Sequence, residues 1–194
     1  MGSVYHECQT FKKEDFTQMN LQNQEFEECL FQNCNFAGTD LSHCNFIECI
    51  FEDCDLSLSI LNNTSLQNAQ FNKCKLMGLD FSVCNEFLFS TSFKACILDL
   101  ADFFQRKLKE TRFIDCSLKE TNFTESDLSS ALLQNCDLSG AMFSRTILSK
   151  TDFTTARHFS IDPDINHVKG AKFALNGLAG LLDKYELEIQ NYSS

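Results

Sequence analysis

Cysteine is the residue type in this sequence with the greatest capacity for chemistry. The chain of 194 residues contains 11 Cys. Cys44, Cys49 and Cys54 stand five residues apart. Cys34, Cys54 and Cys74 stand twenty apart, a regularity that metal binding or redox chemistry could use. No paired His with zinc-ligand spacing accompanies them. Because a buried thiol packs as a small hydrophobic group, the spacing favours a structural role, and we predict no metal site.

Histidine and carboxylate side chains offer no catalytic arrangement either. The four histidines share no common spacing: His6, His43, His158 and His167. The sequence lacks a Gly-rich phosphate loop, a nucleophile elbow and a helix carrying paired His. Adjacent acids such as Glu52 and Asp53 are simply explained as solvated surface charges. We therefore predict no catalytic residues, no cofactor and no enzymatic activity.

The sequence that positions the cysteines follows a five-residue repeat. A Phe or Leu recurs at every fifth position from Phe11 to Phe81. After a two-residue slip at 82–87, the repeat resumes from Leu88 to Phe153. Two residues before each Phe or Leu, the side chain is usually Cys, Ala, Ser or Thr. A period of five fits neither a helix nor a straight strand, so the chain must turn a corner about every five residues.

A second period of twenty residues indicates that four such sides make one coil. One side then collects Phe11, Phe31, Phe51, Phe71, Phe93, Phe113, Leu133 and Phe153. Like residues stack on like, as in a solenoid whose coils contact only their neighbours. Since strand pairing sets a rise of about 4.8 Å per coil, the sequence predicts an all-β rod on the order of 35 Å long.

The C-terminal segment follows a different pattern. The five-residue repeat stops after Phe153. Apolar residues then fall at three- and four-residue steps and predict a short amphipathic α-helix over roughly 176–184, which would cover the last coil. Residues 186–189 alternate like a short strand. We expect a β-helix over 1–158 and a C-terminal turn, helix and strand over 159–194.

The charge of the chain is strongly acidic, with a formal net charge of −11. Such a protein repels nucleic acid, so we expect a basic protein partner and no direct contact with nucleic acid. The first ten residues resemble no signal peptide, and no apolar run approaches the roughly 18 residues of a spanning helix. We expect a cytoplasmic protein with reduced thiols and no membrane contact.

The acidic residues gather in the first part of the chain. From Glu14 to Asn72 there are ten Asp or Glu and no Lys or Arg. On the predicted rod this is roughly one negative charge per 1.4 Å, against about 1.7 Å for duplex DNA. The candidate residues of a DNA-like surface are Glu25, Glu27, Glu28, Asp40, Glu48, Glu52, Asp53 and Asp55.

Two departures from the repeat mark a second candidate surface. The slip at 82–87 places Phe87 and Phe89 on either side of Leu88, so at least one aromatic ring should point outward. Together with Phe104 they could form an apolar patch for a protein partner. Arg106 occupies a small inward position, which a regular coil cannot accommodate without distortion. Both a functional segment and a tolerated defect remain open as explanations.

The repeated unit itself has a recognisable sequence. Residues 101–103, 121–123 and 126–128 read Ala-Asp-Phe, Thr-Asn-Phe and Ser-Asp-Leu. This pattern closely resembles the pentapeptide-repeat proteins, whose motif is a small residue, Asp or Asn, Leu or Phe, and two variable residues. The ending at 161–173, followed by a Leu-rich segment, is similar to the gyrase-protecting Qnr, McbG and AlbG group of that family.

The resemblance implies a right-handed quadrilateral β-helix that mimics B-form DNA. Such proteins bind DNA gyrase or topoisomerase IV, protect it from quinolones or peptide toxins, and are not enzymes. They form homodimers through the C-terminal segment. Mapped onto this sequence, the dimer interface comprises Leu178, Leu181, Leu182, Tyr185, Leu187 and Ile189. The long loops of Qnr rods are absent here, so an interaction scaffold for a different protein partner stands as the alternative.

Overall fold

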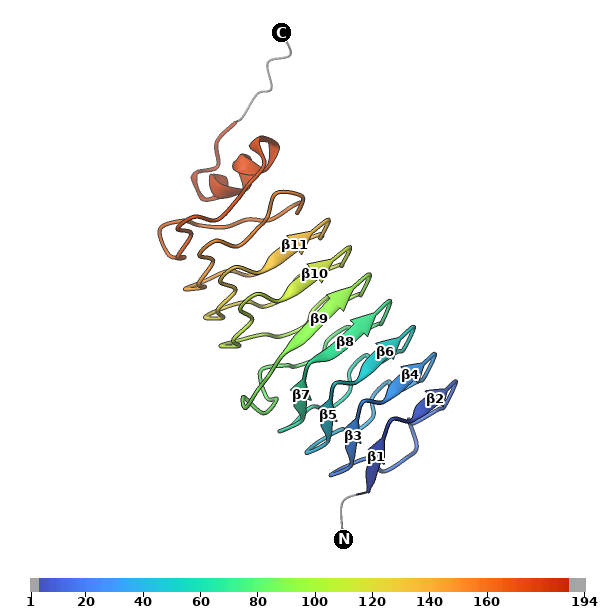
Figure 1. Cartoon of the computed structure of the whole chain (residues 1–194). Coiled ribbons are helices and arrows are strands. Elements are labelled where there is room, and N and C mark those ends of the chain that lie inside the picture. The colour runs from blue at the N-terminus through green and yellow to red at the C-terminus, as the bar shows by residue number, and fades with distance from the viewer. Residues whose placement is uncertain (1–3, 189–194) are drawn as a thin grey trace.

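The computed structural model describes residues 4–188, which wind into a parallel β-solenoid (Figure 1). The strands are β1 (Tyr5–Glu7), β2 (Thr10–Lys12), β3 (Glu25–Glu27), β4 (Leu30–Gln32), β5 (Asn45–Ile47), β6 (Ile50–Glu52), β7 (Ser65–Gln67), β8 (Ala69–Asn72), β9 (Thr91–Lys94), β10 (Arg112–Ile114) and β11 (Leu132–Gln134). Two short 3-10 helices follow them: η1 (Leu175–Leu181) and η2 (Asp183–Tyr185).

Parallel pairing between successive coils builds the faces of the rod. One face is a four-stranded sheet in the order β1-β3-β5-β7, and the next is a seven-stranded sheet in the order β11-β10-β9-β8-β6-β4-β2. Phe31 pairs with Phe11 on one side and with Phe51 on the other, a register of twenty residues. Isolated bridges such as Asp15 to Asn35 and Asp40 to Ile60 continue the remaining faces. The predicted quadrilateral β-helix is confirmed.

Stacked phenylalanine rings fill the interior. Phe51 lies parallel to Phe31 and to Phe71, with ring centroids 4.8 Å apart in both pairs. Rings of neighbouring faces meet edge to face, as for Phe31 and Phe36 at 5.4 Å and 75°. Both are preferred aromatic geometries, and each adds to the free energy gained by burial. The rod therefore has one continuous core along its length.

The cysteines of the repeat serve the backbone as well as the core. Every Cys from Cys29 onward is buried and free. The Sγ atom of Cys49 donates to the carbonyl of Phe26 one coil below, at 3.3 Å, and the hydroxyl of Thr64 makes the equivalent bond to Leu41 at 2.8 Å. Burial raises the pKa of Cys49 to about 12, so its thiol stays protonated and unreactive. The predicted burial of these cysteines is confirmed.

The Asp or Asn of the motif shapes many of the corners that do not follow a β-strand. The side chain of Asn35 accepts the backbone N–H of Ala37 at 3.1 Å, and Asp55 accepts that of Ser57 at 3.0 Å. These Asx turns hold the chain where it leaves one face. The residue after the turn adopts a positive φ, as in Leu58 at 57°. Corners are thus set locally by the short polar side chain.

The structure differs from the sequence prediction at the slip. Leu88, expected in the core, is 61% exposed, and Phe89 packs against the core in its place. The same exchange occurs near the C-terminus, where His158 is exposed and Phe159 is buried. In each case the following side chain is the larger apolar group, and a shift of one residue brings it inward.

Arg106 and the slip form one feature. The Arg106 side chain is 5% exposed, and its guanidinium donates to the backbone carbonyls of Ser82 and Cys84, the latter at 2.6 Å. It also lies 5.3 Å from the ring centroid of Phe89. The extra residues of one coil therefore supply the acceptors that a buried cation in the next coil requires.

The C-terminal end differs from the prediction in two respects. The coil continues beyond Phe153, because Asp152 bridges to Lys172 and Phe173 stacks on Phe153 at 5.2 Å. The helical segment consists of the 3-10 helices η1 and η2 rather than one α-helix. A Cβ at Gly180 would overlap the Phe159 carbonyl, so the glycine permits this close approach.

We expect Gly180→Ala to detach η1 from the last coil. The added methyl group meets backbone, which cannot move aside as a side chain can, and the free energy of unfolding should fall by about 2 kcal/mol. Denaturant unfolding measures this loss. The Ile161 amide, which donates to the Gly180 carbonyl at 2.8 Å, should exchange faster with solvent. Ala179→Ser, at an exposed position of the same turn, is the matched control and should be neutral. Unchanged stability in Gly180→Ala would refute this role.

We expect Arg106→Leu to destabilise the slip. The carbonyls of Ser82 and Cys84 lose their charged donor, and the loss should be about 2–3 kcal/mol. Arg112→Leu, at an exposed position of β10, should change stability by less than about 0.5 kcal/mol. Equal effects of the two substitutions in chemical denaturation would show that Arg106 does not anchor the slip.

Candidate protein-binding surface

The predicted acidic residues do not all lie on one face. Glu27 ends β3, and Glu28 and Glu48 occupy the corner after it in successive coils, so these three lie along one edge of the rod, whereas Glu25 begins β3. Glu52 ends β6 and Asp53 forms the next corner. Asp55 bridges to Asn35 and Asp40 to Ile60, on the other two faces. The structure therefore brings three of these residues together and distributes the rest around the first coils.

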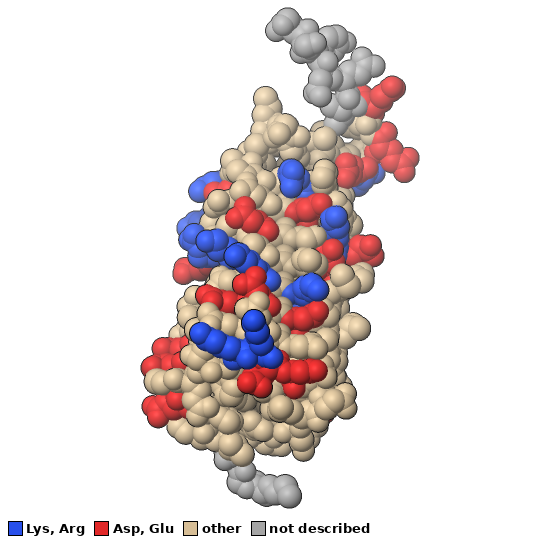
Figure 2. Space-filling view, turned by 90° about the vertical axis from the view of Figure 1, so that its right-hand side faces the viewer, with Lys and Arg blue, Asp and Glu red and all other residues tan. Residues whose placement is uncertain are grey.

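Ion pairing divides the rod into two halves. Among residues 4–188, Asp55 is the one predicted acidic residue with a basic partner, Lys75, at 3.6 Å. Further along the chain, ion pairs connect successive coils: Lys109 with Asp127, Lys119 with Asp137, Arg145 with Glu125, and Lys172 with Asp152. Figure 2 shows blue and red side chains side by side over the upper part of one face and no blue near the N-terminal end. Basic residues thus lie among the carboxylates of the second half, whereas residues 14–72 contain ten carboxylates and no Lys or Arg.

Hydrogen bonds keep some of these carboxylates ionised. The Ser42 hydroxyl holds the pKa of Asp40 below its usual range, assisted by the Ser42 N–H at 2.9 Å. The Thr17 N–H does the same for the pKa of Asp15. A carboxylate stabilised in this way stays charged in mildly acidic solution. These groups contribute negative charge at any physiological pH.

The apolar surface at the slip has a different composition from the one predicted. Phe87 is 70% exposed and Phe104 is 38% exposed, as the sequence indicates. Phe89 instead packs inward under Arg106. Leu88 and Val83 are the exposed apolar residues that sequence reasoning missed. Val83 and Phe104 lie in the turns of one corner, and Phe87 and Leu88 in the turn of the next corner; we name these four residues the corner patch.

The C-terminal segment carries a second exposed apolar surface. Leu178, Leu182, Tyr185 and Leu187 are exposed, whereas Leu181 packs against the core of its own chain. Leu175, which the predicted interface does not include, is 86% exposed. Residues 187 and 188 form no strand, and Ile189 lies outside the described residues. The lysine of η2, Lys184, pairs with Asp162 at 2.6 Å and with Asp164, which fixes this segment to the preceding turn.

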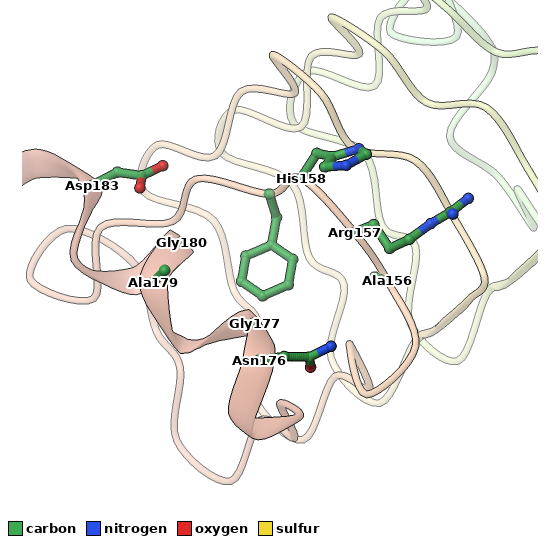
Figure 3. A pocket seen from close by; sticks show the side chains of 9 residues that line it. Ala156, Arg157, His158, Asn176, Gly177, Ala179, Gly180 and Asp183 are labelled. Atoms are coloured by element: carbon green, nitrogen blue, oxygen red, sulfur yellow. The ribbon is translucent and has the colours of Figure 1, made fainter. Parts of the chain in front are cut away.

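A shallow pocket lies where η1 meets the last coil (Figure 3). Its volume is about 420 Å³, and Arg157, His158, Asn176 and Asp183 line its rim. The His158 ring is engaged elsewhere, with Nδ1 2.9 Å from a carboxylate oxygen of Asp137. In the part of the chain that the structure covers, no three His, Cys, Asp or Glu side chains converge to hold a metal ion. No helix within residues 4–188 has the length and apolar character of a transmembrane span.

Comparisons with known proteins agree on the repeat. The family model described as pentapeptide repeat region matches residues 24–86 and 87–157, more than half of the chain. No curated protein sequence matches.

Solved structures share the fold at low sequence identity. A trypsin-treated QnrB1, described as a plasmid-mediated fluoroquinolone resistance protein, is 21% identical with a TM-score of 0.50, over 97% of this chain and 98% of its own. HetL from the cyanobacterium Nostoc sp. strain PCC 7120, described as involved in heterocyst differentiation regulation, is 18% identical with a TM-score of 0.51, over 91% and 89%. The square coil, its stacked core and the matched repeats together establish that the chain belongs to the pentapeptide-repeat family.

Proposed function

We propose that this protein binds a type II topoisomerase, DNA gyrase or topoisomerase IV, in the groove that otherwise holds DNA. The observation that carries the proposal is the set of unneutralised carboxylates on the first coils. Coils that rise about 4.8 Å each present these charges at a linear density close to that of duplex DNA. A basic groove built for phosphates would accept them in the same way.

Protection against quinolones or peptide toxins would follow from such binding, because the drug acts on the enzyme–DNA complex that the rod displaces. QnrB1, with the same fold, is described as a fluoroquinolone resistance protein. In this proposal the protein acts in the cytoplasm, by binding and without catalysis, and contacts no nucleic acid itself. HetL shares the fold with a different described role, so the charged surface, and not the fold, supports the proposal.

A second copy of the chain is the proposed partner of the C-terminal surface. Leu178, Leu182, Tyr185 and Leu187 would be covered in a homodimer, while Leu181 already packs within its own chain. This arrangement places the acidic coils at the two outer ends of a longer rod. Each end could then engage basic surface independently.

The alternative function is an interaction scaffold for another protein. The observation that favours it is the corner patch, since Phe87 and Leu88 are more than half exposed on an otherwise polar rod. A partner bound through this patch would dissociate little as salt rises, whereas a topoisomerase bound through carboxylates would dissociate steeply.

We expect the protein to alter gyrase supercoiling at micromolar concentration and to change its inhibition by a quinolone. Replacing Glu28, Glu48, Glu52 and Asp53 with Lys should weaken the effect by at least about tenfold, because each exposed charge contact contributes up to about 1 kcal/mol. Supercoiling assays over a salt series measure both effects.

The matched control carries the same number of charge reversals in the second half of the rod, at Asp99, Glu110, Asp115 and Glu120. These substitutions should leave the effect within about threefold of the original. No effect of the original protein on gyrase or topoisomerase IV, with or without drug, would refute the proposed function. Equal loss in both quadruple variants would refute the assigned surface alone.

We expect Leu182→Glu to shift the protein from dimer to monomer, since a carboxylate in an apolar interface costs far more than one in water. Sedimentation equilibrium measures the change. Phe87→Glu, which introduces the same charge at the corner patch, is the control and should leave the dimer intact. A monomeric original protein at tens of micromolar would contradict the proposed interface.

A further inference from the structure

The N-terminal end of the rod presents an open sheet edge. The strands β1 and β2 each stand last in their sheets and pair on one side only (Figure 1). At the opposite end, η1 lies against Phe159 and covers the last coil. Within residues 4–188, no segment covers the first coil in this way. The outer edge of its strands is therefore unpaired, and the end of its hydrophobic core is uncovered.

The hydrogen bonds of β1 show which of its groups are unpaired. The Val4 carbonyl accepts from the Glu25 N–H at 2.9 Å, and the Cys8 N–H donates to the Glu27 carbonyl at 3.0 Å. In a parallel ladder the residues of one strand alternate in direction. The backbone groups of His6 therefore face β3, and those of Tyr5 and Glu7 face away from it. Such an edge is a template on which another chain can form a strand.

The interior of the first coil opens at the same end. A cavity of about 330 Å³ is lined mainly by His6, Phe11, Phe16, Leu21 and Phe26. The His6 ring stacks on Phe26 at 4.7 Å and 7°, and Phe26 stacks in turn on Phe46 at 5.1 Å. Phe26 is covered on both ring faces, whereas His6 is covered on one. An aromatic side chain placed beneath His6 would extend this column by one step.

The charges beside β1 determine which residue types of an added strand would be favoured next to its aromatic residue. Glu7 points outward from β1, and Glu25 and Glu27 lie in the adjacent strand β3. The Tyr5 hydroxyl donates to Glu27 at 2.7 Å. The two bases of this coil lie on the next face, Lys12 at the end of β2 and Lys13 at the corner after it. A strand added to β1 would therefore meet carboxylates on its outward side.

We propose that β1 binds an extended segment of a partner protein in which an aromatic residue stands between two basic residues. The segment adds a strand to the edge of Tyr5 and Glu7. Its aromatic side chain enters the cavity beneath His6, and its basic side chains lie beside Glu7, with Glu25 and Glu27 one strand further along the rod. This site uses the end of the rod, and it is independent of the lateral surface in the proposed function.

A fluorescein-labelled peptide of sequence Lys-Lys-Phe-Lys-Lys, with blocked ends, tests the proposal by fluorescence anisotropy. Replacing Phe with Ala should weaken binding by about tenfold, and replacing the four Lys with Glu should abolish it. Hydrogen exchange of the unlabelled complex should slow at the amides of Tyr5 and Glu7 by about tenfold or more, because binding gives them acceptors. The same measurement needs no variant and reports the site directly.

Three variants separate this site from general attraction to an acidic protein. Tyr5→Pro removes an outward N–H and should weaken binding by about fivefold or more, while Tyr5→Phe retains that N–H and should bind normally. Glu7→Lys should weaken binding by about threefold or more, and Glu110→Lys, far along the rod, should not. No binding below millimolar concentration, exchange protection elsewhere, or equal affinity for the Phe and Ala peptides would overturn the proposal. A second copy of the chain held at this edge, seen as an N-terminal dimer by sedimentation and exchange, would do so as well.

Discussion

Parallel pairing at a fixed register of twenty residues is the constraint on which this molecule depends. Since strands of successive coils pair in register, an inward Phe or Leu lies directly against a Phe or Leu of the next coil. Flat phenyl rings meet this requirement well, because parallel rings about 5 Å apart match the spacing that backbone hydrogen bonds impose. The core, the corners and the surface charge pattern all follow from that shared spacing.

The same constraint explains how the irregular coils are tolerated. A register error would move every later side chain to the wrong column, so an insertion has to be absorbed within its own coil. Near residue 88 the chain does this by exposing Leu88 and packing the half-buried Phe89 against the core, while the Arg106 guanidinium donates to the carbonyls of the slip. His158 and Phe159 repeat the exchange of exposed and buried neighbours. In both places the defect stays local and the columns resume.

The sequence alone predicts the fold because periods of five and twenty leave few other ways to bury Phe and Leu. It fails where the period fails: nothing in a two-residue slip states whether Leu88 or Phe89 turns inward. The close approach of Gly180 to Phe159, which accompanies the short 3-10 turns, depends on tertiary contact. Of the candidate site, the outward position of the acidic residues was predictable, but their distribution over four faces and the inward packing of Phe89 depend on tertiary contacts.

The division of ion pairs along the rod also sets how the molecule comes apart. In the second half, bonds between Lys or Arg and the carboxylates of adjacent coils oppose separation of those coils. In the first half, Glu28 and Glu48 lie at equivalent corners of adjacent coils and repel each other. This repulsion grows as the salt concentration falls. In a buffer of low salt concentration, the coils at the N-terminal end thus separate first, and those of the second half separate last. Resistance to unwinding is graded along the axis although the hydrophobic interior is nearly uniform.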